Sequence, residues 1–331
     1  MNPSAGVSRG GVARPADRLA PALWAGLAVG AAVLASVLAG ALAGAALPVV
    51  LGTSITRAGM GVAGVACVGL ALLGVLLPLT GPAARDGAAV LGRADRAIVA
   101  LSGAWLALVI VGIVFRSAAT FGRPVVTLGG GAVVRWMTQL AAGRGMVLTA
   151  GCAAVVLGCA VARIRKPEQV PVRVPLVAGL LGVLTPTVTG HASSAPDHQL
   201  AVVTAAMHVG AAALWAGGLG AVLALVARHR NLLAATLPRF STLAGFCVVV
   251  VALTGVLNAQ VRLESWTALF TTGYGLLIVA KAVCLVLLGG LGGLARRRLA
   301  TDRTPVLRWA GLEVALMAVT LGLAAALTQT A

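Results

Sequence analysis

Nine long apolar stretches divide this chain, and each is long enough to cross a lipid bilayer. A helix needs about 20 predominantly apolar residues to span the hydrocarbon core. Hydrophobic residues make up 60% of the 331 residues and charged residues only 10%, whereas a soluble domain has about 25% charged residues. We therefore expect an all-α integral membrane protein with about nine transmembrane helices. The predicted spans are residues 22–46, 58–79, 97–115, 145–162, 174–190, 200–227, 240–261, 273–295 and 306–328.

The basic residues lie mainly in alternate connections, and this distribution predicts the orientation of the chain. Most of the 25 Lys and Arg residues lie in the N-terminal tail and in the connections after the second, fourth, sixth and eighth spans. Because cytoplasmic connections are enriched in Lys and Arg, we expect the N-terminus in the cytoplasm and the C-terminus outside. The net charge of +17 is therefore a topology signal, and we exclude binding to nucleic acid.

The sequence lacks the motifs of several common membrane enzymes. Neither lysine, Lys166 or Lys281, follows a glycine, so the chain contains no P-loop and is not itself an ATP-driven pump. It contains no H-E-x-x-H and no G-x-S-x-G pattern, which argues against the common membrane hydrolases. The five cysteines lie within the predicted spans and form no C-x-x-C motif. We expect no enzymatic activity.

Three of the four histidines are close together in the sequence, at the predicted outer face. His191 ends the fifth span, Asp197 and His198 lie in the short connection, and His208 lies inside the sixth span. Ionisable residues within a membrane are costly and are functional candidates by default. Imidazole is the commonest metal ligand, so the three histidines form a candidate metal site assisted by Asp197. Interfacial polar roles for His191 and His198, and a helix–helix hydrogen bond for His208, are the alternatives.

Other polar residues are expected at a similar depth on neighbouring spans. Thr254 and Asn258 share one face of the seventh span because they are four residues apart. Lys281 lies inside the eighth span, where it either adjusts the local charge or has no transport role and snorkels, pairs with Glu264 or stays neutral. Together these groups predict a polar vestibule open to the outside. Glu313, near the cytoplasmic end of the ninth span, either pairs with a nearby arginine or lines an inner exit.

One connection carries a helical pattern of its own. Within residues 132–142, apolar side chains recur at Val133, Trp136, Met137 and Leu140 and form a single stripe. This pattern predicts a short helix on the outer membrane surface, with an ordinary loop as the alternative.

Four segments of the C-terminal half resemble the copper-resistance protein D (CopD) family. They cover about residues 190–328 and read GHASSAPDHQLAVVTAAMHVGAAALWAGGL, RFSTLAGFCVVVVALTGVLNAQ, TTGYGLLIVAKAVCLVLL and LRWAGLEVALMAVTLGLAAAL. By this resemblance His191 and His208 match the family's histidines, and Lys281 matches its lysine within a span. Many relatives carry an acid about three residues before the second histidine, and Ala205 stands at that position here.

The resemblance implies a copper-handling protein of the bacterial plasma membrane, commonly regarded as a copper importer. It implies copper as the bound or transported ion and a periplasmic copper carrier of the CopC type as a partner. The expected organisation is a cytoplasmic tail (1–21), an N-terminal four-helix membrane region (22–173) and a CopD-like five-helix core (174–331). Two other functions stay open: a haem-binding electron-transfer protein, and a non-transporting factor that delivers copper to an oxidase.

Overall fold

The computed structural model is helical throughout the part of the chain that it describes, and no strand occurs there. This confirms the predicted all-α class. The structure describes residues 30, 47–78, 80–189, 198–262, 267–272, 275, 276, 278–280, 282–287 and 290. Apart from residue 30, the predicted spans 22–46 and 306–328 lie outside these residues, as does part of 273–295.

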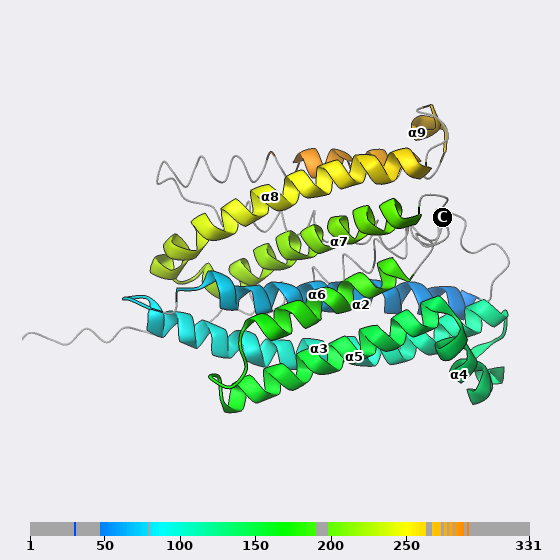
Figure 1. The fold of residues 1–331 in the computed structure, drawn as a ribbon, viewed down its shortest axis with the longest axis horizontal. Coiled ribbons are helices and arrows are strands. Elements are labelled where there is room, and N and C mark those ends of the chain that lie inside the picture. Colours follow the sequence, from blue (N-terminus) through cyan, green and yellow to red (C-terminus); the bar gives the residue numbers. More distant parts are fainter. Residues whose placement is uncertain are drawn as a thin grey trace, which may run out of the picture.

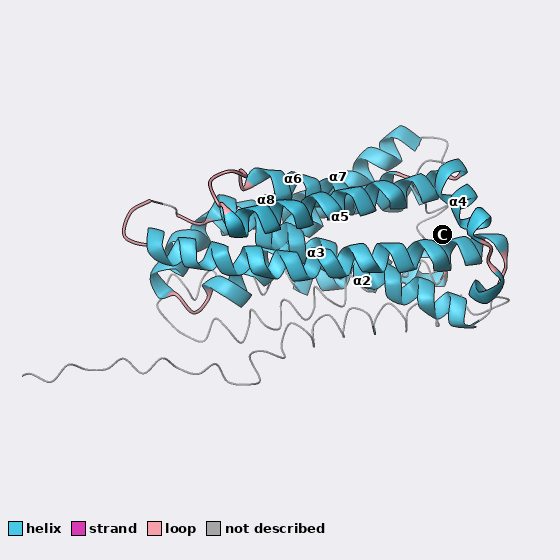
Figure 2. Cartoon of the chain, turned by 90° about the horizontal axis from the view of Figure 1, so that it is seen from below, coloured by secondary structure: helices cyan, strands magenta, loops and turns pink. Residues whose placement is uncertain are grey.

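The helices run along one long axis and alternate in direction (Figures 1 and 2). They are α2 (Leu47–Leu76), α3 (Ala84–Phe121), α4 (Gly130–Gln139), α5 (Ala141–Arg165), α6 (Arg173–Val188), α7 (His198–Ala221), α8 (Arg230–Arg262) and the short α9 (Ala268–Thr271). A 3₁₀ turn (Val125–Thr127) precedes α4, and a π-helical turn (Val222–Val226) extends α7. The starts of α2, α5 and α7 and the ends of α3, α6 and α8 lie toward the right of Figure 1, the end of the bundle that carries α4. We call this side of the bundle the α4 end.

Five of the described helices are long and apolar enough to cross a membrane. They cover Pro48–Leu76, Ala84–Phe121, Ala141–Arg165, Gln199–Val226 and Arg230–Gln260. α6 is apolar but has only 16 residues, which is about 24 Å of helix at 1.5 Å per residue. The chain therefore has the helices of a membrane protein, and the total of nine spans stays a prediction.

Three helices extend well beyond the apolar stretches that predicted them. α2 begins at Leu47 rather than near residue 58, and the threonine hydroxyls in its first turns bond to carbonyls of their own helix. Thr53 donates to the Val49 carbonyl at 2.7 Å and Thr56 to the Gly52 carbonyl at 2.6 Å. α3 and α8 begin at Ala84 and Arg230, more than two turns before their apolar segments. Arg, Leu and Ala are good helix formers, so a helix continues where the apolar run stops.

α2 joins the two predicted membrane regions of the chain. It contacts α3 from the first region and α6 and α7 from the second. The contact with α7 is close because both helices present a glycine: a Cβ added at Gly69 would collide with the backbone of Gly217. In lipid, where the hydrophobic effect does not drive helices together, such small residues permit tight van der Waals contact.

Polar contacts also connect the two predicted membrane regions, at the end of the bundle opposite α4. The Arg239 guanidinium on α8 donates to the carbonyl of Leu76, the last residue of α2, at 3.2 Å. That carbonyl has no partner within its own helix, so the contact satisfies a helix terminus. Nearby, Arg93 of α3 bonds to Nε2 of His229 at 2.9 Å, and His229 lies in the α7–α8 connection.

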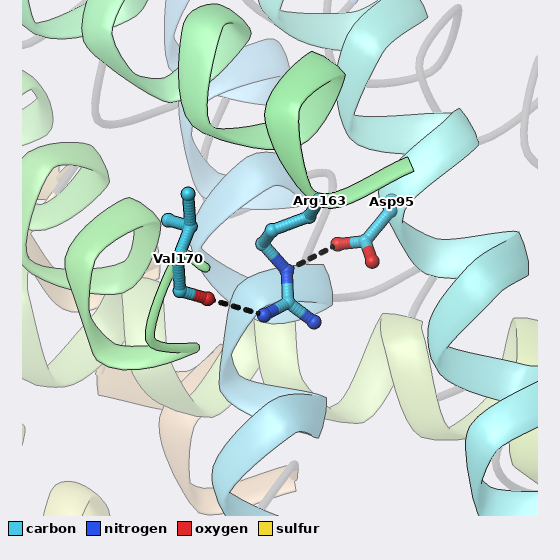
Figure 3. A network of polar contacts seen from close by, with 3 residues as sticks. All are labelled: Asp95, Arg163 and Val170. Carbon is cyan, nitrogen blue, oxygen red and sulfur yellow. Dashed lines mark hydrogen bonds and ion pairs between the residues drawn. The ribbon is translucent and has the colours of Figure 1, made fainter. Parts of the chain in front are cut away.

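A buried ion pair lies between α3 and α5 (Figure 3). Arg163 donates from Nε to Oδ1 of Asp95 at 3.0 Å and from Nη1 to the Val170 carbonyl at 2.8 Å. Their side chains are only 6% and 9% exposed. The pair therefore holds α3, α5 and the α5–α6 connection together. Both residues fall just outside the predicted spans 97–115 and 145–162, yet both lie inside helices, because α3 and α5 extend beyond those apolar stretches.

The predicted short helix at 132–142 is present as α4. Its Trp136 is buried and donates from Nε1 to the Thr120 hydroxyl at 2.9 Å. The other members of the apolar stripe, Val133, Met137 and Leu140, pack partly buried against the core. The stripe thus faces the bundle, and its placement at a membrane surface stays a prediction.

Candidate metal site between helices α7 and α8

Four polar side chains meet between α7 and α8 in two matching pairs. Thr204 and His208 are one helical turn apart on α7, and Thr254 and Asn258 are one turn apart on α8. The two helices are antiparallel neighbours, so Thr204 lies opposite Asn258 and His208 opposite Thr254. Two threonines are buried, whereas His208 and Asn258 are half-buried. These four residues, the α7–α8 polar cluster, lie in the half of the helices nearer the α4 end (Figure 1).

The His208–Thr254 contact fits the tautomer of His208 in which Nδ1 carries the proton. The Thr254 hydroxyl, which has a single proton, lies 2.6 Å from the Val250 carbonyl and can donate to it. The same oxygen lies 3.0 Å from Nδ1 of His208 and can then accept from an Nδ1–H. In this tautomer Nε2 carries the lone pair, and neutral imidazole is the form that binds metal ions. A hydrogen bond on the second nitrogen is the usual way in which proteins orient a histidine ligand.

The second pair fixes the side-chain amide of Asn258. The Thr204 hydroxyl donates to Oδ1 of Asn258 at 3.0 Å and also lies 2.8 Å from the Leu200 carbonyl within its own helix. The pair places an amide and a hydroxyl one turn closer to the α4 end than the imidazole. Oxygen and nitrogen donors thus follow one another along the α7–α8 boundary.

The structure brings together some of the predicted site residues. His208 and Asn258 belong to the α7–α8 polar cluster, as does Thr254, which the sequence had placed on one face with Asn258. Thr204 was missed, although its spacing of four residues from His208 is the same signal that linked Thr254 to Asn258. Met207, which precedes His208, is 51% exposed and belongs to another face of α7.

The other predicted site residues lie mostly outside the described part of the chain. This holds for His191, Asp197, Lys281 and Glu313. His198 is the first residue of α7, about 15 Å of helical rise from His208. Ligands of one metal ion lie only a few ångströms apart, so His198 and His208 are better suited to successive positions than to one coordination sphere.

The α7–α8 polar cluster is too sparse to be a closed metal cage. Within the described ranges, no group of three or more His, Cys, Asp or Glu side chains is arranged to hold a metal ion. One imidazole with hydroxyl and amide neighbours gives weak, open coordination. Such a site favours passage of an ion over its storage, because conduction requires that each position also release the ion.

Part of this chain is similar to a family named for copper resistance. Residues 234–327 match the copper resistance protein D family. The CopD match begins inside α8 and therefore includes Thr254 and Asn258 of the cluster but not His208. It confirms the resemblance seen in the sequence and supports a role in copper handling for a membrane protein.

A curated relative is also a copper-related protein. The chain is similar to the copper transport protein CutJ of Bacillus subtilis (strain 168), at 28% identity over 156 residues. The alignment covers 44% of this chain and 29% of the relative, so the chain spans less than a third of that protein's length. No solved structure matches the chain.

Proposed function

We propose that this protein translocates copper ions inward across the bacterial plasma membrane through an outward-facing, histidine-lined path. The observation that carries the proposal is the His208–Thr254 hydrogen bond, which orients the His208 imidazole as a metal ligand beside the segment that matches CopD. In this arrangement the α4 end faces outward, the N-terminus is cytoplasmic, and nine spans place the C-terminus outside. A carrier of the CopC type would supply the ion, and the protein would act without catalysis.

Each predicted residue has a role in this path. His191, Asp197 and His198 receive the ion at the outer face, and His208 takes it about 15 Å further in. Asn258, held by Thr204, offers an oxygen between these positions. Lys281 adjusts the local charge, and Glu313 lines the inner exit. The five-helix core, residues 174–331, thus carries the path, and the four-helix region, 22–173, supports it.

The direct test is the copper content of purified protein after exposure to copper, measured by mass spectrometry. We expect near-stoichiometric copper in the wild type and a loss of most of it in a His191→Ala/His208→Ala double variant. His229→Ala is the matched control, because this fourth histidine bonds to Arg93 at the other end of the bundle. Equal copper in the double variant and the wild type would refute the histidine path.

Two further measurements, one on the purified protein and one on a deletion strain, separate the two alternative functions. A Soret absorption band that disappears in the His208 variant would assign haem ligation instead, since histidines are common axial ligands of haem iron. Unchanged copper accumulation in a deletion strain that has lost oxidase activity would assign copper delivery to the oxidase.

A substitution at Thr254 tests the orienting role of its hydroxyl. Thr254→Val keeps the shape and β-branching of the side chain but removes the oxygen that accepts from His208. We expect copper affinity to fall by about 10–100-fold, the usual effect of losing such a supporting contact. Thr254→Ser keeps the hydroxyl and is expected to retain most of the affinity. The measurement is a copper titration of purified protein, and equal affinities in the two variants would show that the hydroxyl does not support a ligand.

A further inference from the structure

The α4 end of the N-terminal region is strongly basic. Arg57, Arg116, Arg123, Arg135 and Arg144 all lie on the helices or connections at this end. Between residues 47 and 189 the acidic residues are Asp86, Asp95 and Glu168, and all three lie toward the opposite end of the bundle. The arginines at the α4 end therefore have no carboxylate partner from this region.

Two of these arginines, Arg57 on α2 and Arg116 on α3, approach each other through their side chains. Thr56 of α2 and Met146 of α5 both lie against Gly112 of α3. The Arg116 guanidinium contacts the Met146 sulfur from Nη1 at 3.7 Å, so it reaches back along α3 toward the level of Thr56 and Arg57. Both arginine side chains are half-buried, and they are near enough for their charges to repel each other. Arg57 makes no hydrogen bond or ion pair to any residue that the structure describes.

Two adjacent cations that are withdrawn from water and lack an acid are costly unless an anion joins them. Guanidinium groups present planar forks of N–H donors that match the oxygens of a phosphate group. Arg57 directly precedes the predicted span 58–79 and Arg116 directly follows the predicted span 97–115, so by these predictions both residues border the hydrocarbon core, where it gives way to phosphate headgroups. A polar contact at this depth is in reach of lipid phosphates.

We propose that Arg57 and Arg116 form a binding site for a phosphate group at the α4 end of the bundle. The phosphate comes either from an anionic phospholipid headgroup or from free inorganic phosphate. The site is distinct from the α7–α8 polar cluster and its function does not depend on copper.

The test is the thermal unfolding of the full-length protein in neutral detergent, followed by tryptophan fluorescence. Phosphatidylglycerol, phosphatidylcholine and inorganic phosphate are added separately. A ligand that binds only the folded state raises the unfolding midpoint, by a few degrees for a well-occupied site. We expect this rise with phosphatidylglycerol but not with phosphatidylcholine, and we expect an Arg57→Gln/Arg116→Gln variant to lose it. A matching rise with inorganic phosphate would identify free phosphate as the ligand.

Two further variants separate binding from a structural role. Arg123→Gln/Arg135→Gln removes the same charge from exposed positions and is expected to keep the response to phosphatidylglycerol. Arg57→Lys keeps the charge but not the planar fork, and it is expected to weaken the response without abolishing it. In the absence of any phosphate, Arg57→Gln is expected to unfold at the wild-type temperature or above, because it removes a repulsion. A lower midpoint under those conditions, or an equal lipid response in both double variants, would overturn the proposal.

Discussion

Replacing His208 with alanine is expected to abolish the copper accumulation that this protein gives to the cells expressing it. In the proposed path His208 is the ligand that takes the ion into the interior, and its ring is already oriented by Thr254. Losing only a supporting contact costs about 10–100-fold in metal affinity, so losing the ligand itself is expected to lower the initial uptake rate by at least about tenfold. The measurement is cellular copper over time, with equal protein amounts in the membrane.

Two neighbouring substitutions serve as controls for this experiment. Met207→Ala removes a thioether sulfur, which is a common copper ligand, from the adjacent but exposed position. His229→Ala removes a histidine from the other end of the bundle. Both are expected to leave uptake near the wild-type rate. Unchanged uptake in the His208→Ala cells would exclude this histidine from the path. Equal losses in all three variants would indicate impaired folding and would likewise contradict a specific role.

The second large effect is expected at the buried ion pair between Asp95 and Arg163. Arg163→Met leaves the Asp95 carboxylate buried without its cation and the Val170 carbonyl without its donor. Breaking a buried pair from one side costs about 3–5 kcal/mol, so we expect the free energy of unfolding in detergent to fall by that amount. The measurement is a denaturant titration followed by tryptophan fluorescence.

The loss of stability is expected to be largely reversed when both charges are removed. An Asp95→Leu/Arg163→Met double variant replaces the pair by apolar side chains, and such replacements are often neutral or stabilising. We expect it to regain most of the lost stability. Arg165→Met, an exposed position two residues along α5, is expected to change stability by less than about 0.5 kcal/mol. A double variant as unstable as Arg163→Met would show that the pair contributes more than the mutual neutralisation of its charges.

The positions of the helices were largely predictable from sequence, and their ends were not. Apolar runs located α2, α3, α5, α7 and α8 because each run must be buried in lipid. Helix formation, however, depends on backbone hydrogen bonds rather than on hydropathy. For this reason α3 begins at Ala84, and Asp95 lies inside a helix although the sequence suggested a charged connection. Arg163, one residue beyond the predicted span 145–162, likewise lies inside α5.

In the candidate site, too, some residues were predictable from sequence and others were not. The spacing of Thr254 and Asn258 predicted a shared face, which the structure confirms. Spacing along one helix does not reveal which residues of a second helix lie opposite. Thr204 was therefore overlooked, and its contact with Asn258 appeared only when α7 and α8 were placed side by side.

By itself, the sequence determined that this chain is helical and apolar enough for a membrane, and that its C-terminal half resembles CopD. These properties follow from local composition and from residues at fixed spacing. Only the tertiary structure decided that His208 meets Thr254, that Asp95 meets Arg163, and that Arg57 approaches Arg116 with no carboxylate partner among the described residues. Such contacts depend on the rotation and register of one helix against another, and these are set by side-chain packing across the whole bundle, as at Gly69 and Gly217.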